Sequence, residues 1–275
     1  TNEEAEAVTA ETGKVILIDE HLADSDSMAY ELDRTDDMWS LADYVEKGIE
    51  VLDNDNGFFM MCEGGKVDWS GHANDAATSI HETIALSDAV QVAVDFAAEH
   101  PGECLIIVTA DHETGGMTIG FATTGYDTHF GYLTNQTISF TDFDAVIANL
   151  RENGASFAEA MAEVEKYYGL TTAADQPLSL TDTDLTALKT AYAMSMGTGL
   201  MSNEEAALLY GGYEPFSMAV SHIINNKAGL SYTSYAHTGL QIPVYAMGAG
   251  AENFSGLYDN TDIFNRTMEV MGLTK

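Results

Sequence analysis

Acidic and histidine residues that could bind metal ions gather at three places in the sequence. The candidates, in chain order, are Glu63, Asp68, His72, Asp111, His112 and His237. The first three follow an apolar run at 58–62, and the next two follow an apolar run at 105–108. Imidazole nitrogens and Asp oxygens suit Zn²⁺, and a Glu supplies the oxygen that Mg²⁺ prefers. The residue types therefore favour a metal centre.

The spacing of these residues indicates which helices and strands must bring them together. Asp68 and His72 are four residues apart, so one turn of helix places them on one side. Asp111 and His112 are adjacent and can serve one site only if the strand before them has ended. We expect the runs at 58–62 and 105–108 to be parallel strands whose carboxyl ends face one site. A long helix from after His72 to about residue 100 would form a right-handed crossover between them.

The remaining elements follow from capping and turn signals. A strand is expected at 15–18, a helix from Ser40, a strand at 243–246 and a final helix after Asn260. From about 141 to 227 strand signals give way to repeated helix starts. These starts are Thr141, Ser156, Thr181, Ser202 and Pro215. This block is expected to be a helical insertion at one edge of the sheet.

Charge and hydropathy exclude several classes of partner. The formal net charge is −34, which repels nucleic acid backbones and anionic membranes. No apolar run approaches the roughly 18–20 residues that cross a bilayer, and the acidic first residues do not resemble a signal peptide. We therefore expect neither nucleic acid nor a membrane span. The acidic load also fits adaptation to salt, although the ordinary hydrophobic fraction of 45% argues against it.

Four motifs, in order, resemble the second half of an alkaline phosphatase. They are Glu63-Gly64-Gly65 with Asp68 and His72, Thr109 to Gly116, His237 to Ala246, and Gly248 to Asp262. The resemblance covers roughly residues 58–120 and 232–264. It implies an α/β sandwich with a mostly parallel central sheet flanked by helices, in which residues 1–275 form the C-terminal part of one domain and 141–227 are inserted.

The resemblance also implies roles for the candidate ligands. One zinc ion would be held by Asp68, His72 and His237, and a second by Asp111 and His112. Glu63 would contribute to a magnesium site. The whole enzyme would hydrolyse phosphate monoesters through a phosphoserine and would act in the periplasm or outside the cell. A homodimer is one possible assembly.

One departure from the family pattern limits this expectation. The nucleophilic Ser at a helix start, a metal-binding Asp and a phosphate-binding Arg do not occur in the expected context, and Ser25 in Asp24-Ser25-Asp26 does not follow a strand. We therefore expect a C-terminal portion that needs the missing N-terminal half, binds one zinc ion well and is inactive alone. The alternative is a non-catalytic metal- or phosphate-binding module of the same superfamily.

Overall fold

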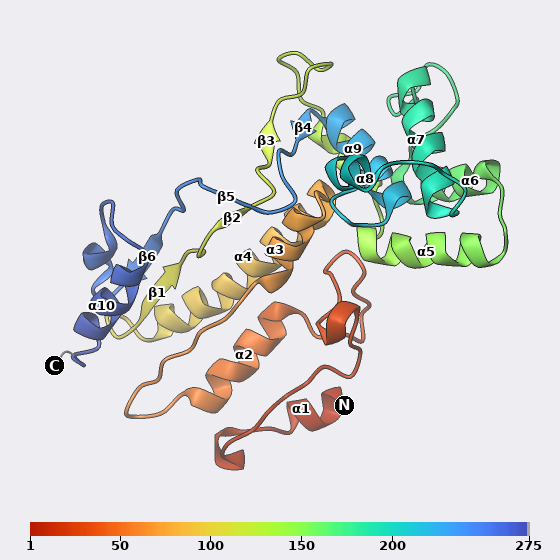
Figure 1. The fold of residues 1–275 in the computed structure, drawn as a ribbon. Helices are drawn as coiled ribbons and strands as arrows, with labels where there is room; N and C mark the ends of the chain where they lie inside the picture. The colour runs from red at the N-terminus through yellow and green to blue at the C-terminus, as the bar shows by residue number, and fades with distance from the viewer. Residues whose placement is uncertain (274–275) are drawn as a thin grey trace.

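The computed structural model describes residues 1–273, which form ten α-helices, six short strands and four 3-10 turns (Figure 1). The helices are α1 Asn2–Glu6, α2 Leu41–Leu52, α3 Gly65–His72, α4 Ala76–Glu99, α5 Phe140–Glu152, α6 Phe157–Tyr168, α7 Asp182–Ser195, α8 Asn203–Tyr210, α9 Pro215–Ala228 and α10 Thr261–Val270. The strands are β1 Leu105–Val108, β2 Glu113–Thr114, β3 Thr118–Ile119, β4 Leu230–Ser231, β5 His237–Thr238 and β6 Tyr245–Gly248.

Local capping signals determine where the helices of the block from α5 to α9 begin. The Ser156 and Thr181 side chains accept hydrogen bonds from the backbone of the third helical residue, and both caps are capping boxes. Helix α9 begins at Pro215, as predicted. Only the first start differs, because Ser139 rather than Thr141 caps α5. Ser139 accepts from two backbone N–H groups, a bonding pattern that the sequence alone did not single out.

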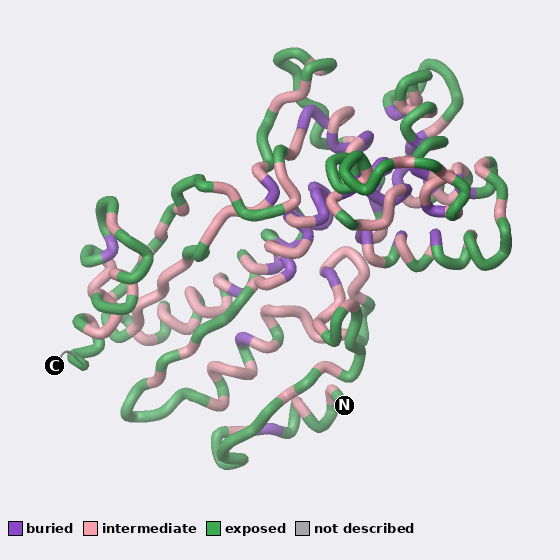
Figure 2. The backbone as a smooth tube through the Cα atoms, viewed as in Figure 1, coloured by how far each residue is buried: buried purple, intermediate pink, exposed green. Residues whose placement is uncertain are grey.

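The block buries most of the core. Helix α9 lies at its centre and packs against α5, α6, α7 and α8. Its Phe216 side chain is fully buried and its ring lies among the aromatic rings of α5, α6 and α7. Figure 2 shows buried residues gathering where α3 and the start of α4 meet this block, while both ends of the chain are mostly exposed.

The two long helices outside the block support the site. Helix α4 packs along α2 and against α3, so these helices lie side by side (Figure 1). Asp75 caps α4 and is fully buried, and its carboxylate accepts from Thr78, Gln136 and Phe140. Burial raises the pKa of Asp75 despite these bonds. This carboxylate joins the helix layer to the beginning of the helical block.

The strand pairing differs from the parallel pair expected from the sequence. Strand β1 pairs antiparallel with β6, in a register that places Leu105 opposite Gly248. Gly248 has φ +98°, and a Cβ there would clash with the carbonyl oxygen of Cys104, so this pairing requires glycine. Within residues 1–273 all three two-stranded ladders are antiparallel.

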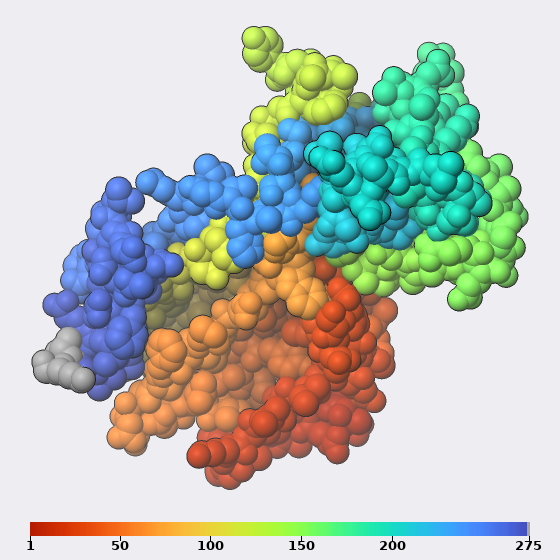
Figure 3. Space-filling model, in the orientation of Figure 1, coloured from red at the N-terminus to blue at the C-terminus, as the bar shows by residue number. Residues whose placement is uncertain are grey.

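Residues 58–62, predicted as a strand beside β1, are extended but form no strand in the described chain, and neither do residues 15–18. In both segments alternate apolar side chains face solvent. Ile16 is 86% exposed and Met61 is 78% exposed. The alternation itself is strand-like, so the prediction failed because the ladder partners are missing within the described residues. Figure 3 shows these N-terminal segments, in red and orange, on a different side of the molecule from the helical block.

The described residues contain no helix that is both long and apolar enough to cross a membrane.

Candidate metal centre

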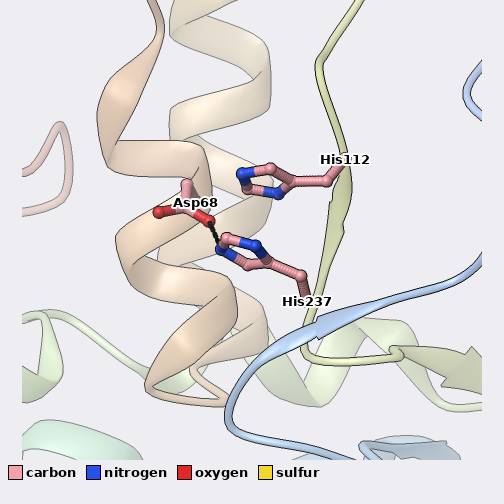
Figure 4. Close-up of side chains that lie close together, drawn as sticks. All are labelled: Asp68, His112 and His237. Carbon is pink, nitrogen blue, oxygen red and sulfur yellow. Dashed lines mark ion pairs between the residues drawn. The ribbon is translucent and has the colours of Figure 1, made fainter.

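Three of the candidate ligands meet where α3 faces two extended segments (Figure 4). Asp68 lies on α3, His112 precedes β2, and His237 begins β5. One ligand atom from each of these three residues lies within 4.8 Å of the other two. Residues 68, 112 and 237 are remote in sequence, so their convergence is a property of the fold.

His72 joins this group through Asp68. As predicted, the spacing of four places both side chains on one face of α3, and His72 Nε2 lies 3.4 Å from Asp68 Oδ1. His237 Nε2 lies 3.8 Å from the same oxygen. Two ligands of a tetrahedral zinc ion, each about 2.0–2.1 Å from the metal, are roughly 3.3 Å apart. The pair separations are therefore close to those of a zinc site.

A backbone carbonyl sets the tautomer of His72. Its Nδ1 lies 2.7 Å from the carbonyl oxygen of Tyr235. A carbonyl can only accept, so Nδ1 carries the proton and Nε2 keeps a free lone pair. This is the arrangement found around histidine ligands, in which the second ring nitrogen donates to a fixed acceptor.

Thr114 organises the other side of the site. Its hydroxyl lies 2.5 Å from Asp68 Oδ1 and 3.3 Å from His112 Nδ1. An ionised carboxylate can only accept, so the hydroxyl donates to Asp68 and accepts from His112 Nδ1–H. The Nε2 of His112 then has a free lone pair and lies 3.4 Å from Asp111 Oδ2. The His112 and His237 rings stack with centroids 3.4 Å apart.

Short strands and a glycine hold these segments together. Strands β2 and β5 pair so that Thr114 lies opposite His237, and Glu113 accepts from the Thr238 hydroxyl across this pair. Gly115 follows at φ +84°, where a Cβ would lie 2.5 Å from the carbonyl oxygen of Gly71. Only glycine lets β2 approach α3 this closely. Strand β2 has only two residues, so it gave no periodic signal in the sequence.

The predicted ligands differ in exposure and placement. The Asp68 and His72 side chains are 34% and 26% exposed, whereas Asp111 is 82% exposed and points into solvent beside His112. Glu63 is exposed and lines a cavity of about 280 Å³ with Lys66, Trp69 and Glu82. Among the described residues, Glu63 forms no hydrogen bond or ion pair with Asp68. The structure thus brings together Asp68, His72, His112 and His237, with Asp111 adjacent and Glu63 apart.

Two solved structures of known proteins share this architecture. A cold-active alkaline phosphatase from a psychrophilic Shewanella species superimposes with a TM-score of 0.69 at 27% identity, over 90% of this chain and 54% of that one. The Thermus thermophilus alkaline phosphatase gives a TM-score of 0.68 at 19% identity, over 90% of this chain and 51% of that one, and so bears on the fold alone. The chain is therefore an α/β protein of the alkaline phosphatase-like fold, as the sequence predicted.

Sequence comparison gives the family. The profile described as "Alkaline phosphatase" matches residues 20–273. Alkaline phosphatase 3 of Bacillus subtilis (strain 168) is 32% identical over 241 residues, which are 87% of this chain and 46% of that protein. Alkaline phosphatase 4 of the same strain is 29% identical over 89% of this chain and 46% of its own length. The chain belongs to the alkaline phosphatase family, and it spans about half the length of these relatives.

Proposed function

We propose that this chain supplies most of the metal-binding part of an alkaline phosphatase that hydrolyses phosphate monoesters. The observation that carries the proposal is the convergence of Asp68, His72, His112 and His237 at separations that suit Zn²⁺. Family membership supports the reaction class. The periplasmic or secreted location and a homodimer are further parts of the proposal that rest on the family alone.

The donor set supports zinc better than magnesium. Asp68, His72 and His237 would hold one zinc ion, and Asp111 and His112 would form the start of a second site beside it. When bound, such ions polarise phosphoryl oxygens and lower the pKa of water. Within the described residues, Glu63 does not belong to a group of three side chains that could hold an ion together. It does not make a magnesium site alone, and we propose that other parts of the whole enzyme complete that site.

The chain's own residues orient the ligands rather than attack phosphate. Tyr235 and Thr114 fix the two histidine tautomers. Ser25, the nearest candidate nucleophile in the sequence, lies in the exposed turn Asp24–Asp26 and donates to Asp24. We propose that the phosphoserine forms on a Ser that this sequence does not contain, and that the helical block of residues 140–228 is an insertion in the same domain.

Zinc titration of the purified chain tests the metal assignment. We expect one tight zinc ion by calorimetry and by native mass spectrometry. His72→Ala should weaken zinc binding at least tenfold, since removal of a ligand leaves only two protein donors. The exposed His129→Ala, remote in sequence from every ligand, is the matched control and should leave affinity unchanged.

The close grouping of Asp68, His112 and His237 supports an alternative set of ligands for the tightly bound zinc ion. If these three residues form the tight site, His112→Ala will weaken binding more than His72→Ala. Equal small losses in both variants would contradict a zinc centre here.

The same chain should hydrolyse p-nitrophenyl phosphate at no more than background, and robust turnover that a chelator abolishes would contradict the proposed absence of a nucleophile.

A further inference from the structure

Asn74 lies two residues beyond His72 and connects three parts of the molecule. It is 3% exposed and adopts φ +52°, a left-handed conformation that few residues other than glycine adopt readily. Its backbone N–H donates to the carbonyl of Gly71 at the end of α3, which closes the turn. The side chain thereby reaches both the end of α3 and the segment that precedes His237.

The Asn74 amide has a single orientation that satisfies its neighbours. One end lies 3.1 Å from the carbonyl oxygen of Gly71 and 2.8 Å from that of Ser234. Two carbonyls can only accept, so this end is Nδ2. Oδ1 then faces His222 Nε2 at 3.3 Å and accepts a hydrogen bond from its N–H group. Burial lowers the pKa of His222 to about 4, so this imidazole is neutral at neutral pH.

A further bond ties the same residue to the helical block. Asn225, one turn after His222 on α9, donates from its side chain to the Asn74 carbonyl oxygen at 2.7 Å. The residue thus bonds α3, the loop before β5 and helix α9 at once. The bonds to Gly71 and Asn225 are buried, and those to Ser234 and His222 are partly buried, so losing them leaves polar groups short of partners.

Packing holds the His237 side chain only on one side, through the His112 ring, so hydrogen bonds to its loop contribute to its position. The His237 side chain is 48% exposed, and β5 is a two-residue strand. Beyond that short ladder, the preceding loop is held by Thr233 and Ser234, which donate to the Gly115 carbonyl, and by the Asn74 bond to Ser234. Two side chains tie this loop to the end of α3: His72, through the Tyr235 carbonyl, and Asn74, through the Ser234 carbonyl. Of the two, Asn74 also bonds helix α9.

We propose that Asn74 is a positioning residue that holds the His237 loop against α3 and couples the metal centre to the helical block. The inference rests on the proposed function, because the spacing that it fixes matters for a shared metal ion. Asn74 contacts no reacting atom and acts through the loop that carries His237.

The test uses the full 275-residue chain with two variants. Asn74→Gly keeps the left-handed backbone but removes every side-chain bond. Asn74→Asp keeps the shape and removes both Nδ2 donors, which serves if the glycine variant does not fold. In metal-free protein, hydrogen exchange at the amides of Thr233 and Ser234 should speed up at least tenfold. The zinc dissociation constant should rise by about 10–100-fold, as for other lost partners of metal ligands.

A matched control separates positioning from stability. Leu188→Ala removes a fully buried side chain from α7, so it should lower the melting temperature without changing loop exchange or zinc affinity. In the double variant Asn74→Gly with His237→Ala, zinc affinity should equal that of His237→Ala alone. Unchanged exchange or unchanged affinity in the Asn74 variants would overturn the inference while leaving the zinc centre intact. A wild-type chain that binds no zinc would overturn the proposed function itself, before any variant is made.

Discussion

The helical block of residues 140–228 and the extended segments around residues 15–18 and 58–62 use apolar side chains in opposite ways. In the block, Phe143 and Leu188 are fully buried. In the extended segments, Ile18 is 71% exposed and Phe59 is 64% exposed. Both regions are rich in apolar residues, so composition does not separate them. The difference lies in whether each region finds its packing partners within the described chain.

This contrast follows from how the two kinds of element are stabilised. A helix satisfies its backbone bonds internally and needs only one buried face, which neighbouring helices of the block provide. A strand needs a partner on at least one edge, from another part of the chain, and cover on at least one face. The metal centre draws its ligands from both kinds of element. It takes Asp68 from a helix backed by the block, and His237 from a short strand on the exposed side.

The largest predicted effect compares one aromatic residue from each region. Phe216→Ala should lower the free energy of unfolding by about 3–5 kcal/mol, because it empties a fully buried site among three aromatic rings. Phe59→Ala removes a ring that is 64% exposed and should cost less than about 0.5 kcal/mol. Urea unfolding of both variants measures the difference. Similar losses would show that Phe59 is packed in solution and that the contrast is wrong.

A smaller effect concerns Glu82, a buried carboxyl on α4 that accepts from the backbone N–H of Glu31. Burial raises the pKa of Glu82 to about 7. The folded state therefore holds a proton that the unfolded state has released, and stability falls as pH rises from about 4.5 toward 7. Above pH 7 the loss no longer grows, because both states are then ionised.

Glu82→Gln removes this cost while keeping an acceptor for Glu31. The variant should match the wild type near pH 4.5 and exceed its unfolding free energy at pH 8 by about 1–2 kcal/mol, somewhat less than the full linkage of the raised pKa. Urea titrations in chelator at both pH values provide the measurement. Glu99→Gln, an exposed position on the same helix, is the control and should change neither value. A variant less stable than wild type at pH 8 would mean that the carboxylate is stabilised by Lys66.

The difference between local patterns and contacts between distant segments explains what could be predicted from the sequence. Caps such as Ser40, Ser156 and Thr181 were found because a capping box is a pattern of four residues. Asp68 and His72 were paired because helical spacing is local. The pairing of β1 with β6 was missed, because it joins residues 137 to 143 positions apart and no local pattern records it. Asn74 and Thr114 were missed for the same reason, since their roles exist only between segments.

The smallest predicted effect asks whether the two regions unfold together. Ser156 caps α6 in the block and Ser40 caps α2 beside the extended segments, each through a capping box. Replacing either by Ala should cost its own helix about 1 kcal/mol. We expect only Ser156→Ala to shift the main urea transition, because α2 packs chiefly on α4 and can open without the block. Hydrogen exchange of α2 should nevertheless quicken in Ser40→Ala. Equal shifts of the main transition would mean that α2 and the helical block unfold as one cooperative unit. The contacts of the extended segments would then be as effective as those of the block.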